Sequence, residues 1–318
     1  MKKLYFFSLL LIYLNCFGQA ATEAKIYQNY PKGMQMVQFG YLLQTSNATI
    51  DGNLTIPNNE IDVKANIGYI RYASFFDIAG KTAALQIMLP YADINAEILG
   101  IEANKSGMGD IMVVVGSNIL GGNSMTFPQF IQSPKKTALA WSFAVSAPTG
   151  KYASDKLLNP GNNRWQFKPE LALTIPLGNF DIETYAHAKF FSKNNDALQF
   201  IPNQNANILE QKPFYGLTFH TVYNFSSKFW IAFDAASRIG GETIKNSIHQ
   251  KDSQTLLGLG GTLTYSPSIH HQFGASYMSN AAGNDYAPDG SLFNVKYSYV
   301  FGGKIRETMN AIKNTQNK

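Results

Sequence analysis

The 318-residue sequence is poor in charge and has a single cysteine. Only 15% of its residues are charged, while 45% are hydrophobic and 13% are aromatic. A disordered chain is rich in charge and poor in aromatic residues, so this composition excludes that class. Mean hydropathy is nevertheless -0.14, and beyond the N-terminus no apolar run approaches the roughly 20 residues of a spanning helix. A helical membrane protein is therefore excluded as well.

The one cysteine, Cys16, lies in a segment with the features of a secretory signal. Two lysines precede an apolar stretch from Leu4 to Leu14, and the small-residue site Gly18-Gln19-Ala20 follows. This order predicts a signal peptide over residues 1–20 that is cleaved near Ala20. Its apolar stretch is too short for a membrane anchor. The mature chain is then expected to lack cysteine, which excludes disulfides, thiol nucleophiles and thiolate metal sites.

Basic residues are only slightly in excess. The formal charge of +5 includes Lys2 and Lys3, and falls to about +3 when the predicted signal is removed. This surplus is too small to indicate a nucleic-acid partner. No histidine, carboxylate or cysteine spacing typical of a metal site occurs. We therefore expect no metal and no cofactor.

From Met34 onward, the dominant pattern is alternation of apolar and polar residues, typical of β-strands with two different faces. Most blocks have about the length of a tilted strand that crosses a bilayer. An all-β fold follows, and we expect a transmembrane antiparallel up-and-down β-barrel of about 12 strands. The alternating blocks are 35–45, 62–76, 80–92, 108–117, 137–148, 164–175, 179–192, 213–225, 228–239, 254–265, 270–279 and 291–301.

The connections between blocks separate a barrel from a soluble sandwich, whose strands also alternate. Long and short links follow one another, as in outer-membrane barrels with short periplasmic turns and long external loops. The stretch 118–136 departs from this rule and is interpreted as a periplasmic excursion or a missed hairpin. The external loops are expected at 46–61, 93–107, 149–163, 193–212, 240–253 and 280–290.

The chain is thus expected to have four parts. The signal peptide of residues 1–20 is followed by an N-terminal segment, 21–33, which lies in the periplasm or tucks into the lumen as a small stopper. The barrel spans 34–303, and a polar tail covers 304–318. Tyr299 or Phe301 would supply the aromatic signal that the barrel-assembly machinery reads. Two aromatic girdles are expected, one at each membrane boundary. The inner girdle, next to the short turns, would contain Phe180, Phe225, Phe229, Trp230, Tyr265 and Phe301, and the outer girdle would include Tyr41, Tyr152 and Trp165.

Three motifs occur in a fixed order in the first half of the barrel. They are Gly107-Met108-Gly109-Asp110-Ile111, Ala147-Pro148-Thr149-Gly150-Lys151-Tyr152, and Asn159-Pro160-Gly161-Asn162-Asn163-Arg164-Trp165 followed by Pro169. In these motifs the chain resembles the family named for the meta-pathway of phenol degradation. The resemblance implies a transporter in the outer membrane of a Gram-negative bacterium. Its partners would be outer-membrane lipid and a small hydrophobic or aromatic solute.

The motif residues also have a direct physical interpretation. Asp110 is expected to cap loop amides or to pair with a cation. The residues Pro148, Thr149, Gly150, Asn159, Pro160 and Gly161 favour turns. These residues either serve only to fold the loop, or they make the loop a lid or vestibule over the pore.

Charged residues gather on the inward faces of three blocks, with signs that nearly balance. We expect either a structural ladder of opposite charges or a constriction for ions or substrate. Small neutral residues on 137–148 and 254–265 would leave a passage suited to an uncharged or aromatic solute. The pathway residues are Arg164, Lys168, Glu170, Asp181, Glu183, His187, Lys189, His220, Asp234 and Arg238.

Two other functions remain open on the sequence alone. A barrel lipid hydrolase would need a histidine and serine pair near the outer lipid boundary. The five histidines do not fit that arrangement, so no catalytic residue is predicted. A non-specific small-solute porin is the other alternative. The sequence favours a channel for passive uptake of small hydrophobic or aromatic compounds.

Overall fold

The computed structural model describes residues 23–47, 61–98, 100–197 and 207–305. The predicted signal peptide and most of the predicted tail lie outside these residues. Parts of the external loops expected at 46–61 and 193–212 lie outside them as well.

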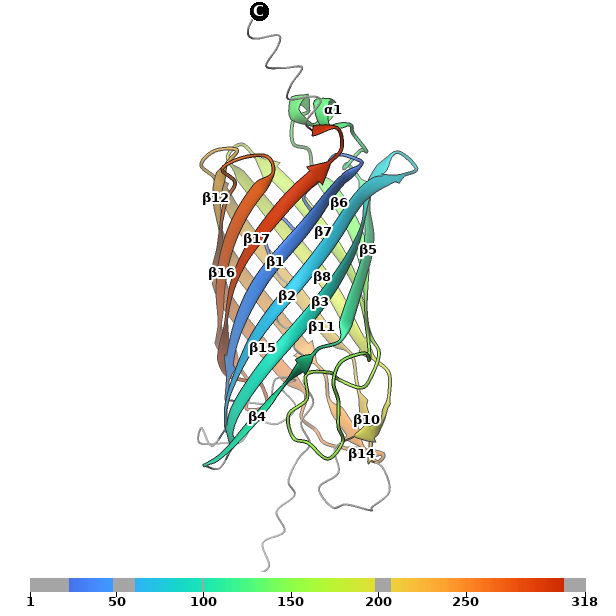
Figure 1. Ribbon diagram of the computed structural model, residues 1–318, viewed down its shortest axis with the longest axis vertical. Coiled ribbons are helices and arrows are strands. Elements are labelled where there is room, and N and C mark those ends of the chain that lie inside the picture. Colours follow the sequence, from blue (N-terminus) through green and yellow to red (C-terminus); the bar gives the residue numbers. More distant parts are fainter. Residues whose placement is uncertain (1–22, 48–60, 99, 198–206, 306–318) are drawn as a thin grey trace, which may run out of the picture.

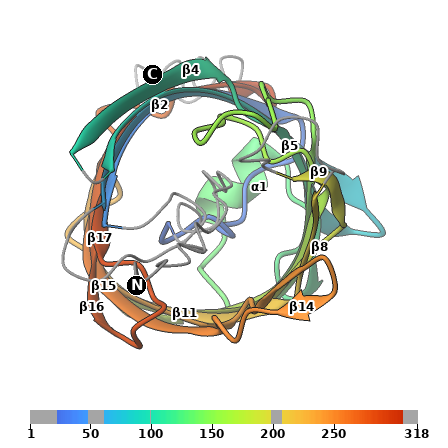
Figure 2. The same cartoon turned by 90° about the horizontal axis from the view of Figure 1, so that it is seen from below.

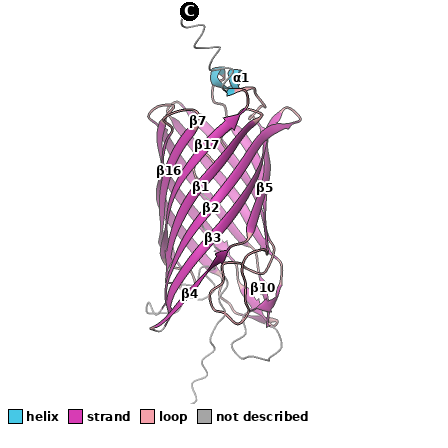
Figure 3. Cartoon of the chain, viewed as in Figure 1, coloured by secondary structure: helices cyan, strands magenta, loops and turns pink. Residues whose placement is uncertain are grey.

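The described residues form a closed barrel of 12 antiparallel strands, which confirms the predicted fold (Figures 1 and 3). Each strand pairs with its neighbours in sequence, and β1 closes the ring by pairing with both β2 and β17. The barrel strands are β1 (Met34–Ser46), β2 (Ile61–Ile78), β3 (Lys81–Ile98), β5 (Ile111–Leu120), β6 (Ala138–Ala147), β7 (Gln166–Leu177), β8 (Phe180–Phe191), β11 (Phe214–Asn224), β12 (Phe229–Gly240), β15 (Gln254–Tyr265), β16 (His271–Gly283) and β17 (Gly290–Gly302).

The two faces of β8 show how alternation becomes a membrane wall. Asp181 and Glu183 face inward and are 3% and 1% exposed, whereas the outward Phe180 is 44% exposed. Large exposed hydrophobic side chains recur on the outer surface of the other strands. Such a surface is stable only when lipid covers it. Among the described residues, no helix has both the length and the apolar character needed to cross a membrane.

The connection expected as an external loop at 93–107 is largely a regular hairpin. Strand β3 continues to Ile98 and β4 (Ile101–Met108) pairs with it, from Tyr91 with Met108 to Ile98 with Ile101. Figure 1 shows this hairpin running past the rim of the barrel. Its physical reason is burial, because Ile94 packs with Ile67 and with Leu158 from the loop after β6. The apolar cluster makes a longer strand more stable than a solvated loop.

The exceptional stretch 118–136 contains no hairpin and holds the short helix α1 (Phe127–Gln132). Its first turn carries Pro128, and the Gln129 side chain accepts a hydrogen bond from the Thr126 backbone amide at 2.9 Å. Both features stabilise a helix start. In Figure 2, α1 lies across the opening of the ring. Of the two interpretations of this stretch, the missed hairpin is wrong, and the periplasmic position of the excursion stays a prediction.

At the opposite end, two loops pair into a small sheet of four strands. These are β9 (Asn194–Ala197), β10 (Asn207–Gln211), β13 (Thr243–Lys245) and β14 (Ile248–His249), in the order β14-β13-β10-β9. The loops expected at 193–212 and 240–253 are therefore partly regular. Asp252 fixes this sheet by accepting hydrogen bonds from the Thr243 backbone amide at 2.7 Å and its hydroxyl at 2.5 Å.

Candidate functional site

Residues 23–33, which we call the N-terminal segment, lie inside the barrel. Figure 2 shows this blue segment crossing the interior of the ring. It is anchored at the end near α1, where the backbone amides of Lys32 and Gly33 donate to the carbonyls of Met125 and Phe75, each at 2.8 Å. From there the segment runs into the lumen, and Ala24 is 4% exposed.

Glu23 lies between two cationic side chains of the barrel wall. Its Oε2 is 2.5 Å from Lys296 Nζ and 3.5 Å from Arg71 Nη2, and its Oε1 accepts a hydrogen bond from Asn294 at 3.0 Å. Burial by itself would raise the pKa of Glu23. The charges of Lys296 and Arg71 outweigh burial and lower the pKa to about 2. The carboxylate is therefore held charged in the lumen.

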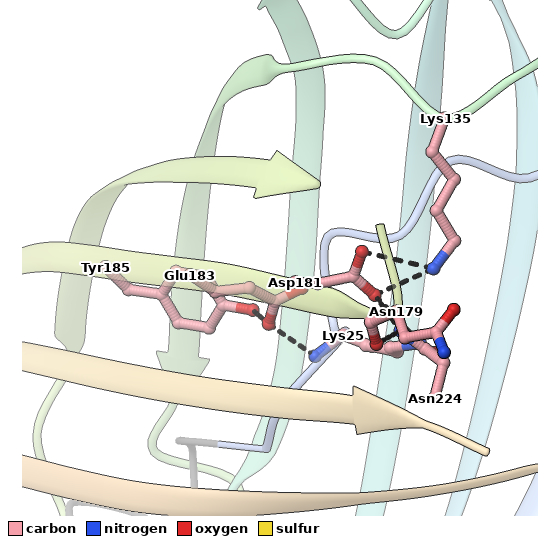
Figure 4. Close-up of polar contacts among 7 residues, drawn as sticks. All are labelled: Lys25, Lys135, Asn179, Asp181, Glu183, Tyr185 and Asn224. Carbon is pink, nitrogen blue, oxygen red and sulfur yellow. Dashed lines mark hydrogen bonds and ion pairs between the residues drawn. The ribbon is translucent and has the colours of Figure 1, made fainter. Parts of the chain in front are cut away.

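Lys25 contacts the opposite wall (Figure 4). Its Nζ lies 3.2 Å from Asp181 Oδ2 and also donates to the Asn224 side chain. The Lys25 backbone amide donates to Glu183 Oε2 at 2.7 Å. Lys135, from the stretch after α1, reaches the same Asp181 oxygen at 2.8 Å. One carboxylate thus joins the N-terminal segment to the stretch that carries α1.

The ammonium of Lys25 also lies 5.0 Å from the centre of the Trp230 ring. Trp230 is only 8% exposed and packs with Ala24 and Val222 inside the barrel. The expectation that Trp230 belongs to the inner girdle is therefore wrong. It alternates with the outward-facing Ile231, so its ring is placed on the lumen side.

Tyr27 is held by the wall made of β6, β7 and β8. Its hydroxyl donates to Glu170 Oε1 at 2.5 Å and lies 2.7 Å from Ser142 Oγ. Its ring meets that of Tyr185 edge-on, with centroids 5.0 Å apart. On the other side of Glu170, Oε2 is 2.9 Å from Lys168 Nζ and 3.4 Å from His187 Nδ1.

The lumen charges therefore have partners that the sequence interpretation missed. A ladder between strands was expected, and part of it exists, because Glu170 contacts Lys168 and His187. Asp181 and Glu183, however, contact the N-terminal segment. The alternation of Glu23, Lys25 and Tyr27 was a weak signal of that role. Nothing in the sequence states which wall each of these residues would contact.

His220 and Asp234 form a second inward-facing pair on adjacent strands. His220 Nδ1 lies 2.6 Å from Asp234 Oδ1, and the Thr262 hydroxyl donates to Asp234 Oδ2 at 2.6 Å. His220 and Asp234 are 0% and 2% exposed. The pair thus links β11, β12 and β15 through buried polar contacts, and it lies on the lumen side, away from lipid.

The remaining predicted cations pack against aromatic rings. Lys189 lies 5.3 Å from the centre of the Phe191 ring, and Arg238 lies 4.6 Å from that of Phe214 while donating to Gln254 at 2.7 Å. Arg164 is not on the expected strand face. It precedes β7, is 1% exposed, and donates to Gln211 of β10 at 2.7 Å. It therefore fixes the external sheet to the barrel.

The three sequence motifs meet in one structural unit. Asp110 accepts hydrogen bonds from the backbone amides of Gly150 and Asn162, each at 2.9 Å, and from the Asn162 side chain at 2.8 Å. Of the two roles expected for Asp110, the structure shows capping of loop amides. Gly150 and Gly161 are in close contact, and a Cβ on Gly150 would lie 2.6 Å from the Gly161 Cα.

The loop between β6 and β7 is further closed by Asn159. Its Oδ1 accepts from the Ala153 amide at 2.8 Å, and its Nδ2 donates to the carbonyls of Ala153 and Lys156, each at 3.0 Å. Pro148 and Thr149 end β6, and the Thr149 hydroxyl accepts from the Ile111 amide at 3.0 Å. Pro160 lies next to Gly161 and places its carbonyl near Gly109. Part of this loop lies within the outline of the ring in Figure 2.

A cavity of about 160 Å³ lies between the N-terminal segment and the wall of β3, β5, β6 and β7. One side of it is apolar, with Met88, Met112 and Val114, and the other carries Lys168, Glu170 and His187. A smaller cavity of about 60 Å³ shares His187 and lies against β12, β15 and β17. In the described part of the chain, no group of three histidine, cysteine or acidic side chains is placed to hold a metal ion.

Several solved structures are similar to this barrel. The COG4313 outer membrane channel from Pseudomonas putida F1 matches with a TM-score of 0.75 and 20% identity, covering 88% of this chain and all of that one. The beta domain of the Bordetella autotransporter BrkA has a TM-score of 0.49 and 14% identity, covering 85% and 100%. The Pseudomonas putida toluene transporter TodX has a TM-score of 0.44 and 9% identity, covering 87% and 93%.

The first of these likenesses establishes the barrel fold, and the other two are too distant to carry an argument. No curated protein sequence matches the chain. A family model described as "Putative MetA-pathway of phenol degradation" matches residues 44–297, from the end of the first strand to the last. The chain belongs to this family.

Proposed function

We propose that this protein is an outer-membrane channel of a Gram-negative bacterium for the passive uptake of small hydrophobic or aromatic compounds. The observation that carries the proposal is the lumen cavity of about 160 Å³, with its apolar side at Met88 and Met112 and its polar side at Glu170 and His187. Ligand sites of this kind combine an apolar lining with a few polar groups. Family membership and the name of the similar COG4313 outer membrane channel support the same conclusion.

The N-terminal segment is part of this proposal. It occupies the lumen through side-chain contacts of Glu23, Lys25 and Tyr27 with three different regions of the wall. These contacts are polar and reversible. The segment therefore acts as a stopper that blocks free flow of ions and water and shifts when a solute passes.

Two alternatives are less well supported. A non-specific porin needs an open aqueous lumen, whereas here the N-terminal segment crosses the interior and contacts the wall on several sides. A lipid hydrolase needs a nucleophile and base that reach the lipid. The His220 and Asp234 pair, the most enzyme-like arrangement in the described residues, is buried on the lumen side.

Two experiments test the proposal. The protein should fractionate with the outer membrane and migrate differently on a gel before and after heating; a soluble periplasmic protein would contradict it. Uptake of radiolabelled toluene and phenol is then measured in vesicles with a lipopolysaccharide outer leaflet, with and without the protein. Faster uptake of both is expected, and phospholipid hydrolysis without uptake would favour the enzyme.

A control separates the channel from a porin. The same vesicles are given a charged sugar acid of similar mass, which should enter slowly. Equal rates for the sugar acid and for toluene would contradict a preference for apolar solutes. A variant that lacks residues 23–30 should pass both faster, since β1 starts only at Met34.

A further inference from the structure

The cavity beside Tyr27 has the size of one aromatic ring. Its volume is about 160 Å³, and an apolar cavity of about 150 Å³ is large enough to bind benzene. Side chains of Met88, Met112 and Val114 line one side of it. These flexible and branched side chains adapt well to a flat ring.

The opposite side of the cavity presents buried polar atoms. Glu170 is 6% exposed, and its Oε1 receives the hydrogen bond of the Tyr27 hydroxyl. His187 Nδ1 is buried, makes no hydrogen bond within the described residues, and lies 3.4 Å from Glu170 Oε2. Because Lys168 Nζ already lies 2.9 Å from Oε2, the oxygen open to a ligand hydroxyl is Oε1, in place of the Tyr27 hydroxyl. A ring without a hydroxyl that displaced Tyr27 would leave Glu170 Oε1 without the hydrogen bond it now receives.

Tyr27 already shows how the wall binds a phenol group. Its hydroxyl lies 2.5 Å from Glu170 Oε1 and 2.7 Å from Ser142 Oγ, and its ring meets Tyr185 edge-on. Glu170 and Ser142 are buried and belong to the rigid wall of β6 and β7. The wall groups therefore recognise a hydroxylated ring, and this ring currently comes from the N-terminal segment itself.

We propose that the cavity binds a single hydroxylated aromatic ring, and that the hydroxyl of this ligand competes with the Tyr27 hydroxyl for Glu170. The inference rests on the proposed function, because it names the solute class of the same lumen. Binding of the ligand then weakens one of the three attachments of the N-terminal segment. The solute itself promotes the shift that lets it pass.

The test is equilibrium dialysis of radiolabelled phenol and benzene against the full-length protein in detergent micelles, with protein-free micelles subtracted. Tyr27→Phe removes the competing hydroxyl and keeps the ring, so phenol should bind about tenfold more tightly, while benzene binding stays unchanged. Glu170→Gln should weaken phenol binding about tenfold. Tyr30→Phe is the matched control, because Tyr30 packs on Phe75 at 4.5 Å, and it should bind phenol as the native protein does.

Weaker phenol binding by Tyr27→Phe would overturn the competition, and equal affinities for phenol and benzene in the native protein would overturn the site. Heat-dependent gel migration checks that each variant folds. If Glu170→Gln fails to fold, phenol binding by Tyr27→Phe still tests the competition for Glu170. Phenol uptake by the native protein in the same vesicles separates this inference from the proposed function. Normal uptake without competitive binding rejects only the site, whereas no uptake rejects the channel.

Discussion

Lys25 and Asp181 form an ion pair inside the barrel, with Nζ 3.2 Å from Oδ2, and both side chains are less than one-tenth exposed. The pair joins residues that are far apart in the chain, one in the N-terminal segment and one at the start of β8. Because Lys135 contacts the same carboxylate, Asp181 keeps one cationic partner if Lys25 is lost. The N-terminal segment would then lose its attachment to β8 while the carboxylate stays neutralised.

We therefore expect Lys25→Met to open the channel without unfolding it. Methionine keeps the length of the side chain against Trp230 but removes the charge. Loss of the pair should cost about 1–2 kcal/mol, less than for a buried pair with no second cation, and raise the open fraction about 5- to 30-fold. Ion conductance in planar bilayers measures this change. Lys32→Met, at an exposed position of the same segment, is the control, and equal conductance in both variants would contradict the attachment.

Glu23 gives a prediction about pH. Its pKa is about 2 when the segment is in place, below the ordinary value of 4.5. A lowered pKa means that the charged carboxylate stabilises the closed arrangement fully above about pH 4.5, and that this stabilisation is lost as the pH falls toward 2. Conductance should thus be constant from pH 8 to 5 and rise only at lower pH.

The Glu23→Gln variant isolates this effect from other acidic groups of the lumen. It should conduct more than the native protein at pH 7, because Arg71 and Lys296 lose their common anion. The difference between the two proteins should shrink as the pH falls below 4.5. A native channel that opens between pH 7 and pH 5 would contradict the assigned role of Glu23.

These contacts show how far the sequence allows prediction. The alternation of Phe180, Asp181, Ile182 and Glu183 identifies the lipid and lumen faces, because side chains on a strand point to opposite sides. Alternation along one strand does not specify what a lumen side chain contacts. For Asp181 the partner lies more than 150 residues away in a segment without strand character, so local pattern carries no information about it.

The strand ends were predicted less well for a related reason. The expected loop at 93–107 contains Asp93, Asn95 and Glu97, which resemble a solvated connection. In the structure they alternate with Ile94 and Ala96, which pack with Leu158 of another loop. Only the tertiary contact makes the longer strand favourable. Trp230 was misplaced similarly, since an aromatic residue next to a turn suits both a girdle and a lumen contact.

Asp110 should control the order of the loop between β6 and β7. Asp110→Ala leaves the amides of Gly150 and Asn162 without their acceptor, at a cost of about 1–3 kcal/mol each if they stay buried. The loop should loosen while the barrel stays intact. Limited trypsin cleavage at Lys151 should become faster, as followed by gel and mass spectrometry. Asp155→Asn, at an exposed ion pair of the same loop, is the control, and an unchanged cleavage rate in Asp110→Ala would contradict the capping role.

The His220 and Asp234 pair is expected to stabilise the barrel and to take no part in transport. Asp234→Asn keeps the shape of the side chain but puts an NH2 donor in place of one carboxylate oxygen. The oxygen lost is either the one that accepts from Thr262 or the one that contacts His220. Because the whole cluster is buried, the mismatch should lower the free energy of unfolding by about 2–4 kcal/mol. A lower urea midpoint in lipid vesicles measures this loss, and toluene uptake should stay unchanged. The opposite outcome, lost uptake with an unchanged midpoint, would place the pair in the solute pathway.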